Sequence, residues 1–76
     1  MALVTDITHL TLQAHSKHTD VDCTYDIVTD VQGNKYLQLD TYGSAGRDIP
    51  GKKSQSIRLS PKAIQQLKNI IATNNL

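Results

Sequence analysis

The sequence of 76 residues contains no tryptophan and no phenylalanine, and it has a single cysteine, Cys23. One cysteine excludes a disulfide within the chain, and no group of thiols is present that could hold a structural zinc ion. A domain of this length buries only roughly 60% of the surface that its unfolded chain exposes, so its core contributes a narrow margin of stability. We therefore expect a single domain, residues 1–76, that forms a homodimer to complete its core.

Long apolar stretches are absent as well. No segment approaches the ~20 apolar residues that a membrane-spanning helix needs. Residues 1–12 carry no lysine or arginine and alternate threonine with apolar side chains, unlike the charged start and continuous apolar stretch of a signal peptide. The sequence predicts a cytoplasmic protein that makes no membrane contact.

The formal net charge is only +1, but the charges are unevenly distributed along the chain. Residues 1–34 hold one lysine against five aspartates, a net charge of −4, whereas residues 35–76 hold seven basic residues against two aspartates, a net charge of +5. The second half is therefore the part that we expect to meet an anionic partner.

The clearest element is a C-terminal helix that begins after Ser60 and Pro61. A serine can cap the first turn of a helix, and proline is favoured at the first helical position because the amide that it lacks would have no partner there. Apolar residues then recur three and four positions apart, which places them on one face of a helix. The pattern predicts a helix that ends near Thr73, where two asparagines follow.

Alternating apolar and polar residues predict strands over residues 21–29, 35–41 and 54–59. The first two are joined by a short segment with Gly33 and Asn34, which is typical of a hairpin turn. A further strand is expected at residues 7–12, which are rich in threonine, although the apolar spacing of residues 1–12 also fits a helix. Residues 41–53 contain three glycines and a proline and predict a long loop, a length typical of functional segments. The resulting fold class is α+β.

The alternation also predicts which side chains are buried. Cys23 and Tyr25 share a face with Val21 and Ile27, so we expect both to lie in the core and Cys23 to be an unreactive structural thiol.

Residues 33–71 carry a recognisable order of elements, in which two strands, a basic Pro-Gly loop, a strand and a helix follow one another. The motif residues are Pro50-Gly51-Lys52-Lys53, Ser56-Ile57-Arg58-Leu59-Ser60-Pro61 and Leu67. This stretch resembles the C-terminal domain of the transcriptional coactivator positive cofactor four and its small bacterial relatives. The resemblance implies a curved antiparallel sheet of four strands backed by one helix, a dimer formed partly through the helices, and single-stranded DNA lying across the sheet and its loops. It also implies that Lys52 and Lys53 contact phosphates. The chain departs from the family at Ile64, where an aromatic residue is usual.

Cations and tyrosines gather on the second strand of the hairpin, the long loop and the last strand. A protein that holds single strands without sequence preference needs cations along the path of the backbone and flat rings for the bases. Tyr36 and Tyr42 alternate with the leucines of their strand, so we expect both rings to face outward, together with Asp26 and Asp40, which would repel phosphate. The predicted nucleic-acid-binding residues are Lys35, Tyr36, Tyr42, Arg47, Lys52, Lys53 and Arg58.

Catalytic and metal-binding patterns are missing. His15 and His18 are three residues apart, with His9 nearby in the sequence, but no ligand spacing of a known metal site accompanies them. Residues 43–46 lack the lysine of a phosphate-cradling loop, and no acid–base pair is apparent. We expect a protein that is not an enzyme and that uses no metal, cofactor or small-molecule substrate.

Two functions fit these features. The first is a homodimeric protein that binds single-stranded or melted DNA, with RNA left open, in transcription or replication. The alternative is an adaptor for another protein, in which the basic residues only solubilise the surface. Binding to an oligonucleotide that weakens steeply with added salt would favour the first function.

Overall fold

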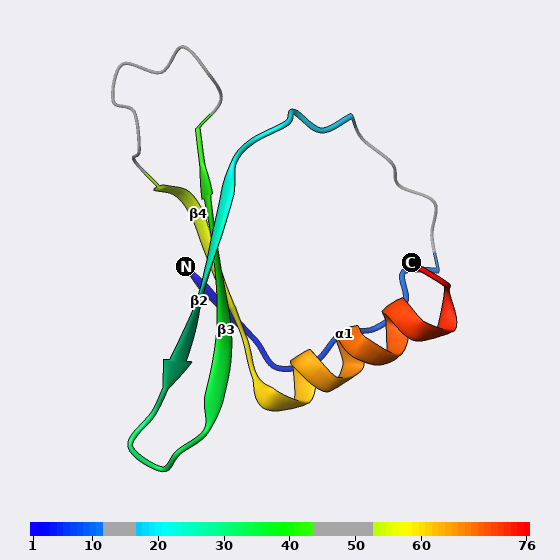
Figure 1. Ribbon diagram of the computed structural model, residues 1–76. Coiled ribbons are helices and arrows are strands. Elements are labelled where there is room, and N and C mark those ends of the chain that lie inside the picture. The colour runs from blue at the N-terminus through cyan, green and yellow to red at the C-terminus, as the bar shows by residue number, and fades with distance from the viewer. Residues whose placement is uncertain (12–16, 44–52) are drawn as a thin grey trace.

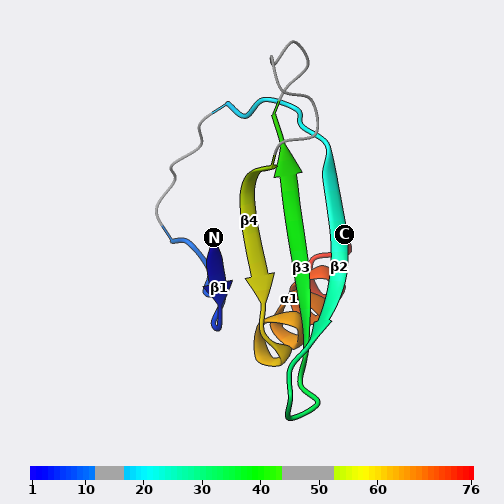
Figure 2. The ribbon, with the colours of Figure 1, turned by 90° about the vertical axis from the view of Figure 1, so that its left-hand side faces the viewer.

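The computed structural model of the chain describes residues 1–11, 17–43 and 53–76 (Figure 1). Within these ranges lie four strands that form one sheet in the order β1-β4-β3-β2 (Figure 2), followed by one helix. The elements are β1 (Ala2–Val4), β2 (Cys23–Thr29), β3 (Lys35–Tyr42), β4 (Lys53–Leu59) and α1 (Pro61–Thr73). The predicted α+β class, a four-stranded sheet followed by a C-terminal helix, is confirmed.

The hairpin of β2 and β3 forms as predicted, with antiparallel pairing over the full length of β2. Its turn is closed by backbone hydrogen bonds from Asp30 N to Asn34 O (3.0 Å) and from Gly33 N to Asp30 O (3.1 Å). Gly33 adopts a φ of 87°, which residues with a Cβ rarely reach. The Asp30 carboxylate accepts the backbone N–H groups of Gln32 and Asn34, both at 2.9 Å, and so fixes the turn.

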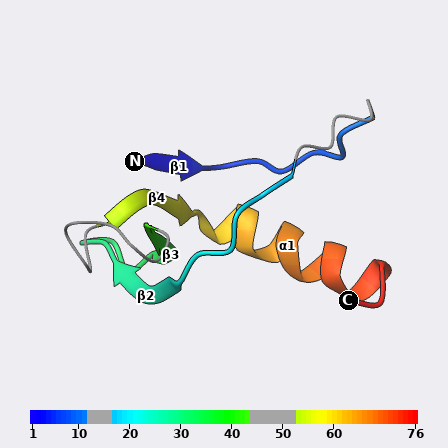
Figure 3. The same ribbon diagram turned by 90° about the horizontal axis from the view of Figure 1, so that it is seen from above.

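The first strand differs from the expectation. It lies at Ala2–Val4, whereas residues 7–11 of the expected strand 7–12 form no strand and residue 12 lies outside the described residues. The first strand pairs parallel with β4, so the sheet is mixed and not wholly antiparallel. Residues 5–11 instead run beside α1 (Figure 3), where Gln66 accepts the Ile7 N–H (2.8 Å) and donates to Asp6 (2.7 Å). The threonine-rich alternation does not produce a strand at residues 5–11, and Gln66 on α1 instead holds Asp6 and Ile7 of this segment.

The helix begins and ends as predicted. Ser60 has extended backbone angles and its Oγ accepts the Ala63 N–H at 3.2 Å, while Pro61 occupies the first turn. The buried apolar side chains of the described residues are Leu59 and Ala63, at the junction of β4 and α1. No helix in the described ranges is long and apolar enough to cross a membrane.

The face of the sheet on the helix side is only partly covered. From its junction with β4, the helix extends away from the sheet (Figure 1), so the half of this face that lies on β2 has no covering element among the described residues. Tyr25 is 74% exposed and Ile27 is 53% exposed, and Cys23 is exposed too. The predicted burial of Cys23 and Tyr25 is therefore wrong in the single chain. The alternation correctly predicted which face of the sheet each side chain occupies. Whether the helix covers that face depends on the direction in which α1 leaves the sheet.

Candidate nucleic-acid interface

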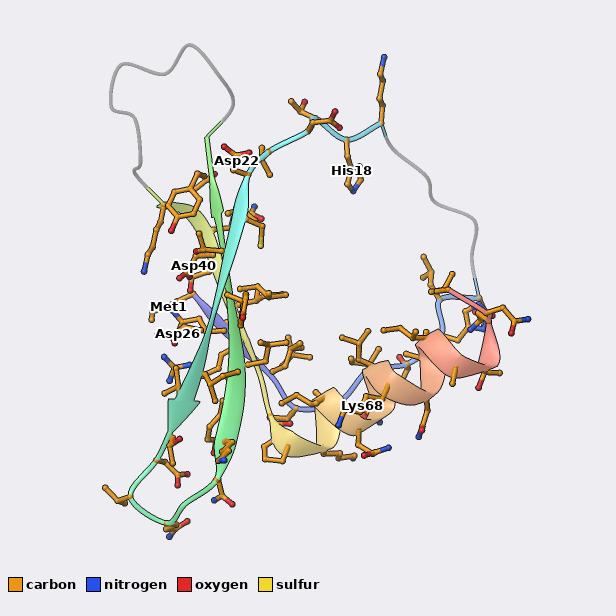
Figure 4. All side chains as sticks on the ribbon, in the orientation of Figure 1. Met1, His18, Asp22, Asp26, Asp40 and Lys68 are labelled. Carbon is orange, nitrogen blue, oxygen red and sulfur yellow. The ribbon has the colours of Figure 1, made fainter. Side chains whose placement is uncertain are left out.

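The other face of the sheet, opposite the helix, is polar. Side chains of directly paired residues project from the same face of a sheet. One such row crosses all four strands. Leu3 on β1 pairs with Arg58 on β4, Arg58 pairs with Gln38 on β3, and Gln38 pairs with Asp26 on β2. In Figure 4 the labelled Asp26 and Asp40 lie on the side of the sheet away from α1. We call this surface the polar face; on β2, β3 and β4 its central residues are Thr24, Asp26, Tyr36, Gln38, Asp40, Tyr42, Lys53, Ser56 and Arg58.

A chain of polar contacts links β3 and β4 across this face. Arg58 donates to Gln38 Oε1 from Nε (3.1 Å) and from Nη2 (2.6 Å). Gln38 Nε2 in turn donates to the carboxylate of Asp40 (3.1 Å to Oδ2), and Lys53 Nζ lies 3.2 Å from the same oxygen. Each group thus fixes the orientation of the next one, which makes the network rigid.

Asp40 is the anchor of this network, with only 6% of its surface exposed. Hydrogen bonds from the Ser56 hydroxyl and the Gln38 amide, together with Lys53, lower the pKa of its carboxyl group, against the opposing effect of burial. Asp40 is therefore a paired carboxylate that holds neighbouring donors in place.

Both tyrosines expected to face outward lie on the polar face, and their hydroxyl groups are held. Tyr36 donates to Asp30 Oδ2 at 3.2 Å, and burial together with that carboxylate raises the pKa of the Tyr36 phenol. The Tyr42 hydroxyl shares a 2.9 Å hydrogen bond with Thr24 Oγ1. These contacts fix the positions of two rings at the surface of the sheet.

A pocket of about 370 Å³ opens on this face, between β1 and β3 and above β4. We call it the polar-face pocket; its lining residues are Met1, Ala2, Leu3, Asp30, Tyr36, Gln38, Ser56 and Arg58. The sequence singled out only Tyr36 and Arg58 of this set. Gln38 and Ser56 share the alternation of these two residues and could have been found in that way, whereas the contribution of β1 depends on its unexpected pairing with β4.

The structure brings together four of the seven predicted binding residues, namely Tyr36, Tyr42, Lys53 and Arg58. Lys35 pairs with Thr29 and lies on the opposite face of the sheet, away from them. Arg47 and Lys52 lie outside the described residues. Lys53 is half-exposed and forms an ion pair with Asp40.

The free edge of β2 is also protected. Asp26 Oδ1 accepts the N–H of Ile27 at 2.8 Å and so occupies a donor that would otherwise face solvent at the edge of the sheet. Metal binding has no support in the part of the chain that the structure describes, since no three His, Cys, Asp or Glu side chains gather there. The absence of a metal in the whole protein stays a prediction.

We expect the stability of the fold to fall in acid. The pKa values of Asp6, Asp30 and Asp40 are all lowered from 3.8, so the folded state binds protons more weakly than the unfolded state. The contribution of these carboxylates to stability is complete when the pH is above their pKa in the unfolded state. It is lost as the pH drops through their pKa values in the folded state. The melting temperature of the protein should therefore change little between about pH 7 and 5 and should fall below about pH 4. The Asp40→Asn variant should lose less thermal stability in acid than the wild-type protein. An equal loss in the two proteins would show that Asp40 is not a main source of the acid sensitivity.

Comparison of the chain with protein-family models, curated proteins and solved structures finds no match. The resemblance to the positive cofactor four family stays a prediction.

Proposed function

We propose that the chain is a small homodimeric protein that binds single-stranded or melted DNA, or RNA of the same form, across the polar face, in transcription or replication. The observation that carries the proposal is the gathering of Tyr36, Tyr42, Lys53 and Arg58 on the face that the helix does not cover. Rings that stack on bases, together with cations that contact the backbone, are the elements of single-strand binding.

The carboxylates of the polar face favour one course for the bound strand. Asp40 is offset by its ion pair with Lys53, whereas Asp26 is exposed near the outer edge on β2. Repulsion from Asp26 would keep phosphates away from β2, so the backbone should run toward Lys53 at the start of β4. The bases then lie over β3, next to the two tyrosines.

A fluorescence anisotropy titration against single-stranded and duplex DNA of equal length tests the proposal. The single strand should bind more tightly, and its affinity should fall linearly with salt on a log–log plot. Replacing Lys52 and Lys53 together by alanine should flatten that slope by up to about 1.4, because each lost phosphate contact contributes roughly 0.7 for a single strand.

Lys68→Ala provides the matched control, because Lys68 is an exposed lysine on α1 (Figure 4) and should leave the slope unchanged. A melting curve is needed for the double variant, since the loss of the Lys53–Asp40 ion pair should lower its stability slightly. An unchanged slope in a folded double variant would remove both lysines from the binding surface.

The homodimer is supported by the uncovered apolar side chains on the helix side of the sheet. Tyr25 and Ile27 on β2 and Ile57 on β4 share this face, and Ile70 and Ile71 on α1 are exposed as well. Exposed apolar clusters of this kind mark contact surfaces. We propose that a second copy covers this face and leaves the polar face open.

The same apolar face supports the second candidate function, an adaptor that binds another protein. In that case the polar face would have no nucleic-acid partner. An absence of oligonucleotide binding even at low salt, by a protein that sediments as a monomer, would favour the adaptor.

A further inference from the structure

We propose that the polar-face pocket binds one unstacked guanine base of the bound strand and that Arg58 recognises it. This inference rests on the proposed function and adds base selectivity to it. Proteins that read single strands splay individual bases out and bind their edges by hydrogen bonds.

Arg58 is held in one orientation at the wall of the pocket. Its Nε and Nη2 atoms both donate to Gln38 Oε1, and Gln38 is held by the buried Asp40, so the plane of the guanidinium is fixed. A guanidinium carries five N–H donors, and this arrangement uses the edge formed by Nε and Nη2. The outer end of the guanidinium, with one N–H from Nη1 and the second N–H of Nη2, has no hydrogen-bond partner among the described residues, and Arg58 lines the pocket. It therefore offers a pre-oriented pair of donors to a ligand.

The chemistry of the other walls of the pocket favours a base over a phosphate. Met1, Leu3 and the ring of Tyr36 supply apolar surface that suits a flat ring. Asp30 also lines the pocket and brings a negative charge that repels a phosphate. Its carboxylate already accepts four hydrogen bonds, from Gln32, from Tyr36 and twice from Asn34, so it has no capacity left to bind a ligand directly. A volume of about 370 Å³ lies at the lower end of the range for ligand sites.

Guanine and cytosine are the two bases that offer adjacent acceptors to the paired donors of an arginine, guanine through O6 and N7 and cytosine through N3 and O2 on its Watson–Crick edge. Guanine is the larger of the two, so its second ring covers more of the apolar wall formed by Met1, Leu3 and Tyr36. Guanine also carries donors on its Watson–Crick edge. Ser56 lines the pocket two residues from Arg58 on the same face, on the order of 7 Å away, and a hydroxyl oxygen can accept such a donor.

The test uses thymine oligonucleotides of equal length that carry one central guanine, 7-deazaguanine, adenine, cytosine or thymine. Anisotropy with the wild-type protein should show the guanine strand bound about 5- to 150-fold more tightly than the thymine strand, the range expected for one bidentate contact. The 7-deazaguanine strand lacks N7 and should lose most of this preference. Arg58→Lys keeps the charge but loses the planar fork, so the ratio between the guanine and thymine strands should approach one.

The outcomes separate the two proposals. Equal binding of all five strands would overturn the guanine site and leave single-strand binding intact, whereas no binding of any strand at low salt would overturn the proposed function itself. A preference for adenine or cytosine would overturn the choice of base. A folded Arg58→Lys variant that keeps the guanine preference would overturn the role of Arg58, and the 7-deazaguanine comparison tests the contact in the wild-type protein whether or not that variant folds.

Discussion

Sedimentation of the protein at tens of micromolar should give a species of twice the 8.4 kDa chain mass. Several large apolar side chains of the described residues are exposed, among them Tyr25, Ile27 and Ile57 on one face of the sheet. Burying them between two copies of the chain would remove this apolar surface from water. The apolar face of β2 and β4 supplies side chains for that interface.

A charge placed on the apolar face should disrupt the dimer. Ile27→Asp puts a carboxylate among these side chains, and we expect either a monomer or an unfolded chain. Val31→Asp is the matched control, because Val31 is fully exposed in the hairpin turn and should leave the dimer intact. A wild-type monomer at these concentrations would contradict the proposed dimer.

Replacing Tyr36 by leucine should weaken the binding of a single strand by about 5- to 150-fold, because one stacked base contributes roughly 1–3 kcal/mol. The salt slope should stay unchanged, since stacking releases no counterions. This combination separates Tyr36 from the lysines, whose replacement should change the slope.

Tyr36→Phe is the control for this variant, because phenylalanine keeps the ring and loses only the hydrogen bond to Asp30. Binding should therefore be largely retained. An equal loss in the leucine and phenylalanine variants would show that the hydroxyl matters and that stacking does not. Tyr42 should respond in the same way if the strand reaches the end of β3.

Local sequence patterns predicted the elements that are stabilised by contacts between residues close together in the sequence. The hairpin follows from two alternating runs and a turn at Gly33, and the helix follows from Ser60, Pro61 and the apolar spacing behind them. The first strand could not be located in this way, because its three residues are defined by pairing with β4 and not by a periodic pattern.

The candidate site was predictable to a similar extent. Alternation along β3 placed Tyr36 and Tyr42 on one face, and the structure agrees. The contacts of Arg58 with Gln38 and of Lys53 with Asp40 depend on the register between β3 and β4, which no local pattern specifies. The burial of Tyr25 was mispredicted for a related reason, since it depends on the path of a helix far along the chain.

The central claim is that a single strand lies across the polar face, and photocrosslinking tests it most directly. A single strand substituted with iodouracil is irradiated in complex with the wild-type protein, and the tryptic peptides are analysed by mass spectrometry. Trypsin releases Tyr36 and Tyr42 on the peptide of residues 36–47, and it releases Tyr25, on the opposite face, on the peptide of residues 18–35. We predict adducts on Tyr36 or Tyr42. Adducts confined to Tyr25 or to α1, with none on residues 36–47, would contradict the claim.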